Sequence, residues 1–279
     1  MSSVPEKKVL LCGSFDNMRA SDIRLLDEAS ALGAVHVFLW DDALVETLTG
    51  KAPKFPQEER LYYVQALNHV STVTLIDRLA SEDELPGPMD VQGATWVVPE
   101  DKDSVDKRAF AAAYGLTYQV VTRETLATYP AWDPNTLTFE TTGRPKVLVT
   151  GCYDWFHTGH VRFFEEVSEL GDLYVVVGHD ANIEALKGKG HPMFKQDERR
   201  YMAGSIRYVT QALISTGDGW LDAEPEIQRI IPDKYAVNED GDKPVKKEYC
   251  AAHGIEYVVL NRLPKPGLTR RESTHLRGF

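Results

Sequence analysis

The chain has few cysteines and no long apolar run. Its 279 residues include only three cysteines, Cys12, Cys152 and Cys250, whose spacing is unpaired, so reduced thiols are expected in place of a disulfide framework. No stretch approaches the roughly 18 consecutive apolar residues of a membrane-spanning helix. The N-terminal segment MSSVPEKKVLL lacks the architecture of a signal peptide. These absences predict a cytoplasmic protein without membrane insertion.

Basic residues are also scarce. The sequence has 42 acidic and 31 basic side chains, a formal net charge of -11, and no dense basic run. A nucleic-acid partner is therefore not expected, and any phosphate-binding site must be a local basic pocket. With 43% hydrophobic and 26% charged residues, the composition is that of a folded globular protein.

Several nucleotide and metal signatures are missing as well. There is no GxxxxGK(S/T) motif and no complete GxGxxG motif, which argues against a P-loop kinase and a dinucleotide-dependent dehydrogenase. Paired C-x-x-C elements and an H-E-x-x-H motif, which are typical of structural and catalytic zinc, do not occur either.

The sequence does contain a pair of histidines, in GCYDWFHTGH, at the start of a predicted helix. A β-branched run at 147–150 predicts a strand, and apolar residues at helical spacing over 161–170 predict the helix that follows. His157 and His160 lie at the mouth of this helix, where unpaired N-H groups and the helix dipole attract phosphate. The pattern indicates phosphate chemistry, while a zinc site with Cys152 as third ligand and simple helix capping remain open.

The sequence also repeats itself. VLLCGSFDNMRASDIRLLDEASALG from Val9 matches VLVTGCYDWFHTGHVRFFEEVSELG from Val147, and FPQEERLYYVQALNHV matches FKQDERRYMAGSIRYV. Each copy alternates strands with helices, which predicts an α/β protein of two tandem Rossmann-like, doubly wound parallel-sheet domains produced by internal duplication. In the second copy, strands are expected at 147–150, 173–177, 212–215, 235–237 and 257–260, and a helix at 196–209.

The two copies differ where chemistry is expected. HTGH becomes RASD at 19–22, so the first copy lacks both histidines and has Asp22, a carboxylate that repels polyphosphate, at its helix mouth. The segment 129–145 is rich in proline, threonine and glycine, which predicts a linker. We therefore expect a degenerate, non-catalytic domain at 1–128 and a catalytic domain at 146–279.

The second copy resembles the nucleotidyltransferase superfamily with the HxGH signature, in its cytidylyltransferase type. GCYDWFHTGH, KGKGHPMF, ERRYMAGSIRYV, NEDGDK and RRESTHLRG occur in the order that this superfamily uses. The tandem arrangement is similar to that of CTP:phosphoethanolamine cytidylyltransferases. The resemblance implies transfer of CMP from CTP to a small phosphorylated alcohol of the phosphoethanolamine or phosphocholine class, a phospholipid precursor. It also implies release of pyrophosphate, and Mg2+ bound to the triphosphate.

Two further hypotheses remain open. The STHLR ending also resembles that of ATP-using relatives, which makes an adenylyltransferase the close alternative, and a catalytically silent nucleotide-binding regulator is the other. Because relatives work as dimers, the resemblance implies that the first copy is an internal partner of the second and that the chain is a monomer.

The resemblance also implies roles for individual residues. The catalytic residues would be His157, His160 and Lys187. The nucleotide would be bound by Gly151, Cys152, Tyr153, Gly159, Arg207, Asp240, Arg271, Ser273, Thr274 and Arg277. The acceptor would be bound by Asp154, Lys189 and Trp220, the last through a cation-π contact with a cationic head group, and no metal ligand is expected from the protein.

Overall fold

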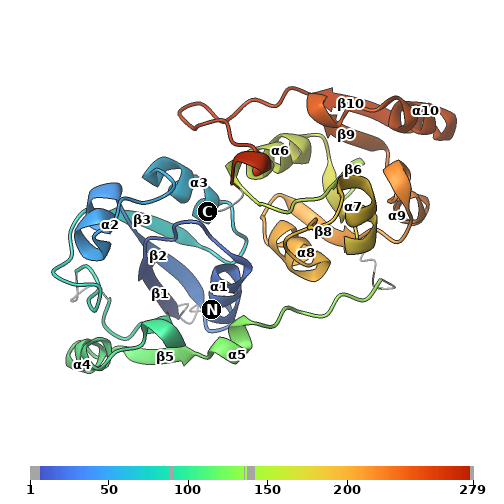
Figure 1. The fold of residues 1–279 in the computed structure, drawn as a ribbon. Coiled ribbons are helices and arrows are strands. Elements are labelled where there is room, and N and C mark those ends of the chain that lie inside the picture. Colours follow the sequence, from blue (N-terminus) through green and yellow to red (C-terminus); the bar gives the residue numbers. More distant parts are fainter. Residues whose placement is uncertain (1–6, 88–90, 135, 137–141, 277–279) are drawn as a thin grey trace. The chain divides into compact units, whose positions relative to one another are not determined.

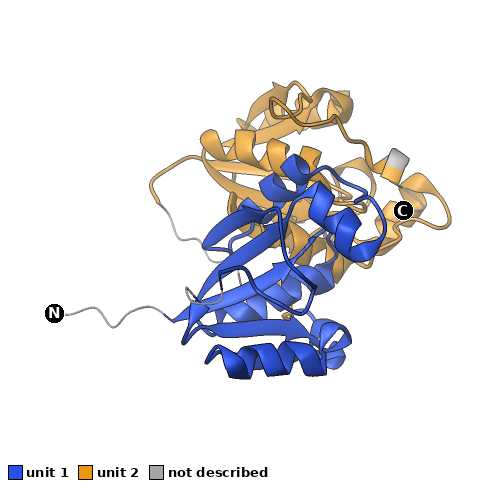
Figure 2. Cartoon of the chain, turned by 90° about the vertical axis from the view of Figure 1, so that its left-hand side faces the viewer, with its two compact units in different colours: residues 1–129 blue, residues 130–279 orange. Residues whose placement is uncertain are grey.

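The structure is a computed structural model that describes residues 7–87, 91–134, 136 and 142–276 (Figure 1). The chain forms two compact units, Met1–Tyr129 and Pro130–Phe279, which Figure 2 distinguishes by colour. Among the described residues, no helix has the length and apolar character that crossing a bilayer requires.

The first unit is a five-stranded parallel sheet with helices between the strands (Figure 1). The strand order is β3-β2-β1-β4-β5. Its elements are β1 (Lys8–Gly13), α1 (Ala20–Ser30), β2 (Ala34–Trp40), α2 (Asp42–Thr49), α3 (Gln57–Gln65), β3 (Thr72–Ile76), β4 (Thr95–Pro99), η2 (Glu100–Lys102), α4 (Val105–Ala113), β5 (Thr117–Val121) and α5 (Arg123–Leu126).

The second unit repeats this topology, with the strand order β10-β9-β6-β7-β8. Its elements are β6 (Lys146–Gly151), α6 (Thr158–Glu169), β7 (Asp172–Val177), α7 (Asp180–Lys187), α8 (Gln196–Gly204), β8 (Val209–Ile214), η3 (Gly219–Leu221), α9 (Glu224–Ile230), β9 (Lys234–Asn238), η4 (Glu239–Gly241), α10 (Pro244–His253), β10 (Glu256–Leu260) and η5 (Ser273–Leu276). The predicted pair of doubly wound α/β sheets is therefore confirmed.

The strand order locates the place where each sheet can bind a ligand. In the second unit the chain runs from β6 outward through β7 and β8, then crosses to β9 on the other side of β6. Ligands of doubly wound sheets bind beyond the carboxyl ends of the strands at such a reversal. The corresponding positions are therefore the ends of β6 and β9 in the second unit, and the ends of β1 and β4 in the first.

Apolar strands buried in the middle of the sheet hold the second unit together. Every residue of β7 is buried, as expected for an inner strand that has helices on both faces. Leu148 of β6, Tyr174 of β7 and Tyr235 of β9 belong to one buried cluster. Because these three strands share one core, their carboxyl ends are held in a defined relation to one another.

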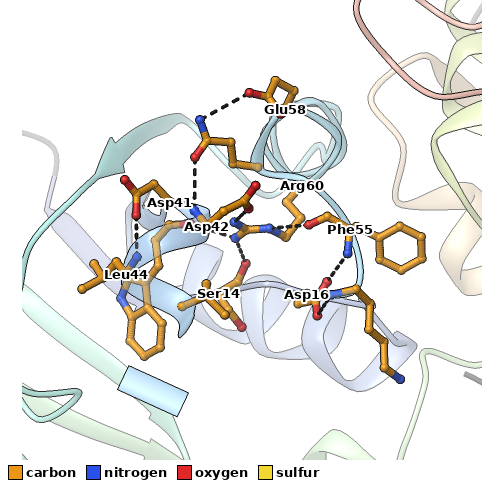
Figure 3. Close-up of polar contacts among 12 residues, drawn as sticks. Ser14, Asp16, Asp41, Asp42, Leu44, Phe55, Glu58 and Arg60 are labelled. Carbon is orange, nitrogen blue, oxygen red and sulfur yellow. Dashed lines mark hydrogen bonds and ion pairs between the residues drawn. The ribbon is translucent and has the colours of Figure 1, made fainter. Parts of the chain in front are cut away.

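A buried arginine braces the loop after the first strand in both units. In the first unit, Arg60 of α3 donates to the carbonyl oxygens of Ser14 at 2.6 Å and Trp40 at 2.8 Å, and to the carboxylate of Asp42 at 2.7 Å (Figure 3). Its side chain is 1% exposed. The hydrogen bonds satisfy a charge that would otherwise be costly to bury.

Arg199 of α8 makes the equivalent contacts in the second unit. It donates to the carbonyl oxygens of Cys152 at 2.6 Å and Gly178 at 2.7 Å, and to the carboxylate of Asp180 at 2.8 Å. The arginine thereby ties α8 and the start of α7 to the loop that carries the GCYDWFHTGH motif. The repeat seen in the sequence is thus a repeat of internal bracing as well.

One expected helix was too long. The helix expected at 196–209 ends at Gly204, and Val209 already begins β8. Ser205, at the C-cap, donates its hydroxyl to the carbonyl oxygen of Tyr201 at 2.8 Å. Glycine and serine disfavour the helix interior, and the β-branched residue that follows is suited to a strand.

The segment predicted as a linker, 129–145, belongs to the second unit from Pro130 onward. Its Trp132 packs against the core cluster of that unit. Arg200 donates to the carbonyl oxygen of Pro130 at 2.9 Å. Proline and glycine exclude regular structure, but they do not prevent an extended segment from packing against a core.

Candidate functional site

A cavity of about 420 Å³ lies at the carboxyl ends of β6 and β9. It sits at the reversal of strand order, where doubly wound sheets bind ligands. It is lined by nine of the residues predicted for the site, Gly151, Cys152, Tyr153, Asp154, Gly159, His160, Lys187, Asp240 and Ser273. Thr150, Asn238, Lys246, Arg262 and Glu272 also line it.

Each of the two histidines uses one ring nitrogen to cap helix α6. His157 is the N-cap residue, and its Nδ1 accepts a hydrogen bond from the backbone N-H of Gly159 at 3.0 Å. Nδ1 of His160 accepts from the backbone N-H of His157 at 3.3 Å. A neutral imidazole whose Nδ1 accepts a hydrogen bond carries its proton on Nε2. Capping therefore sets both histidines to present an Nε2-H donor.

Burial keeps both rings neutral. It lowers the pKa of His157 to about 3, with further lowering from the positive charges of Arg262 and Arg271. Burial also lowers the pKa of His160 well below its ordinary value, followed by the effects of His157, Arg262 and Lys187. The ring centroids are 4.0 Å apart in a stacked arrangement, so a charge on one ring would disfavour a charge on the other.

The buried Nε2 atom of His157 has no hydrogen-bond partner among the residues that the structure describes. A buried N-H without a partner is costly, so this atom is suited to an acceptor that a ligand brings, such as a phosphate oxygen. The zinc alternative would need a ring nitrogen with a free lone pair, whereas both Nδ1 atoms are engaged in the cap and both Nε2 atoms carry protons. In the described part of the chain, no group of three or more His, Cys, Asp or Glu could hold a metal ion.

This pKa shift predicts acid sensitivity of the fold. Above pH 6.5, the ordinary histidine pKa, folded and unfolded chains both have neutral His157, so the shift has no effect. Below pH 6.5 only the unfolded chain gains the proton, so stability should fall until the pH reaches about 3. Thermal unfolding measured between about pH 8 and about pH 4 should show a smaller loss of stability for His157→Asn than for the wild type. Equal acid sensitivity of the two proteins would contradict the shift.

Two glycines leave room for the rings at this site. A Cβ atom on Gly151 would lie 2.7 Å from the ring of Tyr153, and one on Gly159 would lie 2.8 Å from the ring of His157. Both distances are shorter than van der Waals contact allows. Side chains at these positions would displace the ring of Tyr153, which lines the cavity, and the ring of His157, which lies beside Gly159.

Lys187 is the last residue of α7 and lies close to Cys152. Although burial raises the pKa of the Cys152 thiol, the positive charge of Lys187 partly opposes this shift. Asp240 of η4 forms an ion pair with Arg262, and the hydroxyl of Ser273 donates to the carbonyl oxygen of Trp155 at 3.2 Å. Three separate chain segments therefore bring polar groups to one cavity.

Asp154 lines the cavity, but its carboxylate anchors a loop. Its Oδ1 accepts the backbone N-H groups of Met193 at 2.8 Å and Phe194 at 2.9 Å. In the first unit, Asp16 accepts the backbone N-H groups at the equivalent positions, including that of Phe55 (Figure 3). Since both units share this arrangement, it favours a structural role over the predicted contact with the acceptor.

Other predicted residues lie elsewhere. Arg207 precedes the amino end of β8, whereas the cavity lies at the carboxyl ends of the strands. Lys189 is in the exposed loop after α7, and Arg271 lines a smaller neighbouring cavity that includes Thr158 and Pro264. Motif matches in the sequence do not indicate whether a residue lies at the end of the sheet where the cavity is. The side chain of Thr274 and all of Arg277 lie outside the described residues.

Trp220 also does not line the cavity, and its side chain is 57% exposed. The ammonium nitrogen of Lys243 lies 5.5 Å from the centre of its ring. A protein cation therefore already makes a cation-π contact with this ring outside the cavity. The predicted cation-π contact with the acceptor is therefore not supported.

Five polar residues of the cavity were not predicted from the sequence: Thr150, Asn238, Lys246, Arg262 and Glu272. A weak signal existed for two of them. The repeat aligns Lys246 with Lys107 and Arg262 with Arg123, so each basic residue is present in both copies. Asn238 instead replaces Pro99 and has a buried amide oxygen that no described residue hydrogen-bonds.

Comparisons with known proteins define the chemical class. Residues 148–262 match the cytidylyltransferase-like family. FAD synthases from Aciduliprofundum boonei and Thermococcus kodakarensis are each 36% identical to this chain, over 44% and 43% of its length and 80% and 79% of theirs. The bifunctional protein HldE from Campylobacter concisus is 38% identical over 35% of this chain and 21% of its own length.

These relatives correct the expected substrates. The expectation of CTP with phosphoethanolamine or phosphocholine is wrong, because several of the similar proteins are FAD synthases. FAD contains an adenylyl group joined to a flavin phosphate, so its synthesis points to ATP, the alternative that the STHLR ending left open. The chain belongs to the cytidylyltransferase-like family of nucleotidyltransferases.

Proposed function

We propose that the second unit transfers AMP from ATP to the phosphate of FMN, forming FAD and releasing pyrophosphate. The observation that carries this proposal is the pair of neutral Nε2-H donors at the mouth of α6, of which His160 lines the same cavity as Lys187. The similarity to FAD synthases supports ATP and FMN as the substrates. The cavity of about 420 Å³ falls within the range typical of small-molecule sites.

The reaction needs little proton transfer from the protein. The second pKa of a phosphomonoester is about 6, so the attacking oxygen is already ionised near neutral pH. This oxygen forms a bond to the α-phosphorus of ATP while the bond to the bridging oxygen of pyrophosphate breaks. The protein must therefore hold the two oxygens in line and stabilise negative charge around the phosphorus.

The residues in and beside the cavity match these requirements. His157 and His160 would donate their Nε2-H groups to oxygens of the reacting phosphate. Because the pKa values of both rings are lowered, mild acidification would leave them neutral, with the proton on Nε2. Lys187 would place its ammonium between the acceptor and the α-phosphate. Ser273 and Arg262, from the C-terminal segment, would contact the leaving pyrophosphate.

Mg2+ would enter bound to the triphosphate, whose negative charge it offsets. Mg2+ keeps several waters and binds mainly phosphate oxygens together with one or two carboxylates. The cavity has carboxylates at Asp240 and Glu272, and the former is already paired with Arg262. These residues fit a metal that arrives with the nucleotide.

The test is a matrix of nucleotides and acceptors. The full chain is incubated with Mg2+ and either ATP or CTP, and with FMN, phosphoethanolamine or phosphocholine, and both pyrophosphate and the product are measured. FAD should form from ATP and FMN, with no pyrophosphate from CTP and phosphoethanolamine. Turnover of another phosphomonoester with ATP but not of FMN would reject the acceptor. Absence of pyrophosphate with every acceptor would reject the enzyme assignment in favour of a nucleotide-binding regulator.

A further inference from the structure

Lys246 reaches the cavity from α10, a helix that the sequence motifs did not assign to the site. Its ammonium donates to the hydroxyl of Thr150 at 3.2 Å, at the carboxyl end of β6. The same nitrogen lies 5.6 Å from the centre of the Tyr235 ring, whose hydroxyl is 2.6 Å from that of Thr150. The lysine is thus directed by two neutral groups toward the floor of the cavity, between β6 and β9.

The first unit places the equivalent lysine in a different environment. Lys107 is its equivalent in the repeat, and its ammonium forms an ion pair with Asp83 at 2.8 Å. The hydroxyl of Ser104 also donates to Asp83, at 2.7 Å. The cation of the first unit is therefore neutralised within the protein, and its side chain is only 8% exposed.

The second unit also has a lysine and an aspartate at these two positions, but they do not form an ion pair. Asp222 is the equivalent of Asp83, and its Oδ2 accepts a hydrogen bond from the hydroxyl of Ser215 at 2.7 Å. No carboxylate of the described residues lies within 4.0 Å of the Lys246 ammonium, which contacts Thr150 instead. The unit that carries the histidines is thus the unit in which this lysine lacks a direct counter-ion.

The electrostatics of this arrangement favour an incoming anion. Burial lowers the pKa of Lys246, the charge of Lys243 lowers it further, and Asp222 acts in the opposite direction. A phosphate that binds beside the ammonium would supply the missing negative charge and favour the charged form. The chain has a net charge of -11, so such a local cation is needed to draw an anionic substrate to the site.

The position of Lys246 indicates whether it would contact the triphosphate of the nucleotide or the phosphate of the acceptor. The triphosphate of the nucleotide is expected at the mouth of α6 and at Ser273, because these groups supply the helix terminus and the hydroxyl. Lys246 approaches from α10, the helix that also carries the N-cap residue Lys243 beside η3. We propose that Lys246 binds the phosphomonoester of the acceptor and holds its attacking oxygen in the cavity. This inference rests on the proposed transfer to a phosphomonoester.

The test compares Lys246→Met with Lys247→Met in the full chain. Lys247 is the exposed neighbour in the same helix, so its replacement removes the same charge without changing the cavity. Lys246→Met should raise KM for FMN by about 10- to 100-fold, the effect of losing one charged hydrogen bond, and leave KM for ATP within about 3-fold. Lys246→Arg should recover part of the loss, and Lys247→Met should leave both KM values unchanged.

The outcomes separate this inference from the proposed function. An unchanged KM for FMN in Lys246→Met, or an equal rise in KM for ATP, would overturn the role of Lys246 while the proposed function stands. If Lys246→Met does not fold, Lys246→Gln keeps a hydrogen-bond donor without the charge and serves for the same measurements. If the wild type uses another phosphomonoester, FMN is rejected as the acceptor, and the same comparison is made with the phosphomonoester that turns over.

Discussion

Replacing His157 by alanine should lower the rate of nucleotidyl transfer by about 10²- to 10³-fold, because one preorganised donor to the reacting phosphate is lost. The structure permits a sharper pair of substitutions. His157→Asn keeps an oxygen that can accept the Gly159 N-H and cap α6, but it loses the Nε2-H donor. His157→Gln places an amide N-H near the position of Nε2 and loses the cap.

Rates and thermal stability of the two variants should therefore diverge. His157→Asn should unfold near the wild-type temperature and be almost inactive, whereas His157→Gln should be less stable and retain more activity. Arg19→Ala, at the equivalent position of the first unit, should leave most of the activity. A fully active His157→Asn would show that the ring serves only as a cap. An inactive Arg19→Ala would show that the two units are not asymmetric in function.

Replacing Arg199 by methionine should destabilise the second unit by about 3–5 kcal/mol, the typical effect of removing one partner of a buried ion pair. The change would leave the carbonyl oxygens of Cys152 and Gly178 and the carboxylate of Asp180 without their donor. Asp180 is 30% exposed and can be partly hydrated, which favours the lower end of the range. Because the loop after β6 leads directly into the histidines at the start of α6, activity should fall with stability.

Arg60→Met is the matched control in the first unit, since Arg60 makes the same set of contacts (Figure 3). Hydrogen exchange followed by mass spectrometry should show faster exchange in 8–65 for Arg60→Met and in 146–204 for Arg199→Met. Nucleotidyl transfer should fall only in the second variant at a temperature where both remain folded. Equal loss of activity in both would contradict a catalytic site confined to the second unit.

The part of the site that depends on local sequence was predictable. The strand, the glycine and the helix around GCYDWFHTGH are neighbours in the chain, so His157 and His160 had to lie at the mouth of α6 wherever the helix packed. The repeat likewise predicted two sheets of one topology. The role of the first unit as an internal partner stays a prediction.

Residues brought from distant segments were not predictable in the same way. Lys246 and Asn238 reach the cavity because β9 pairs with β6, a neighbour far away in the sequence. Arg207 and Trp220 match motif positions, yet the direction of β8 and the contact with Lys243 keep them from the cavity. The prediction of the acceptor was wrong for a related reason. A short motif does not specify the side chains that surround a substrate.

The sequence by itself determined the fold of each copy, the difference between HTGH and RASD, and the place of the two histidines. The spacing of apolar residues, the internal repeat and the local motif can all be recognised without knowing how distant segments pack. Only the tertiary structure decided their chemistry. Burial and capping set the tautomer and charge of His157 and His160, and sheet order set which cations join them. The same structure separates Lys246 from Asp222 in one unit and pairs Lys107 with Asp83 in the other. A lysine is a ligand-binding group or an internal counter-ion according to which neighbour the packing places beside it.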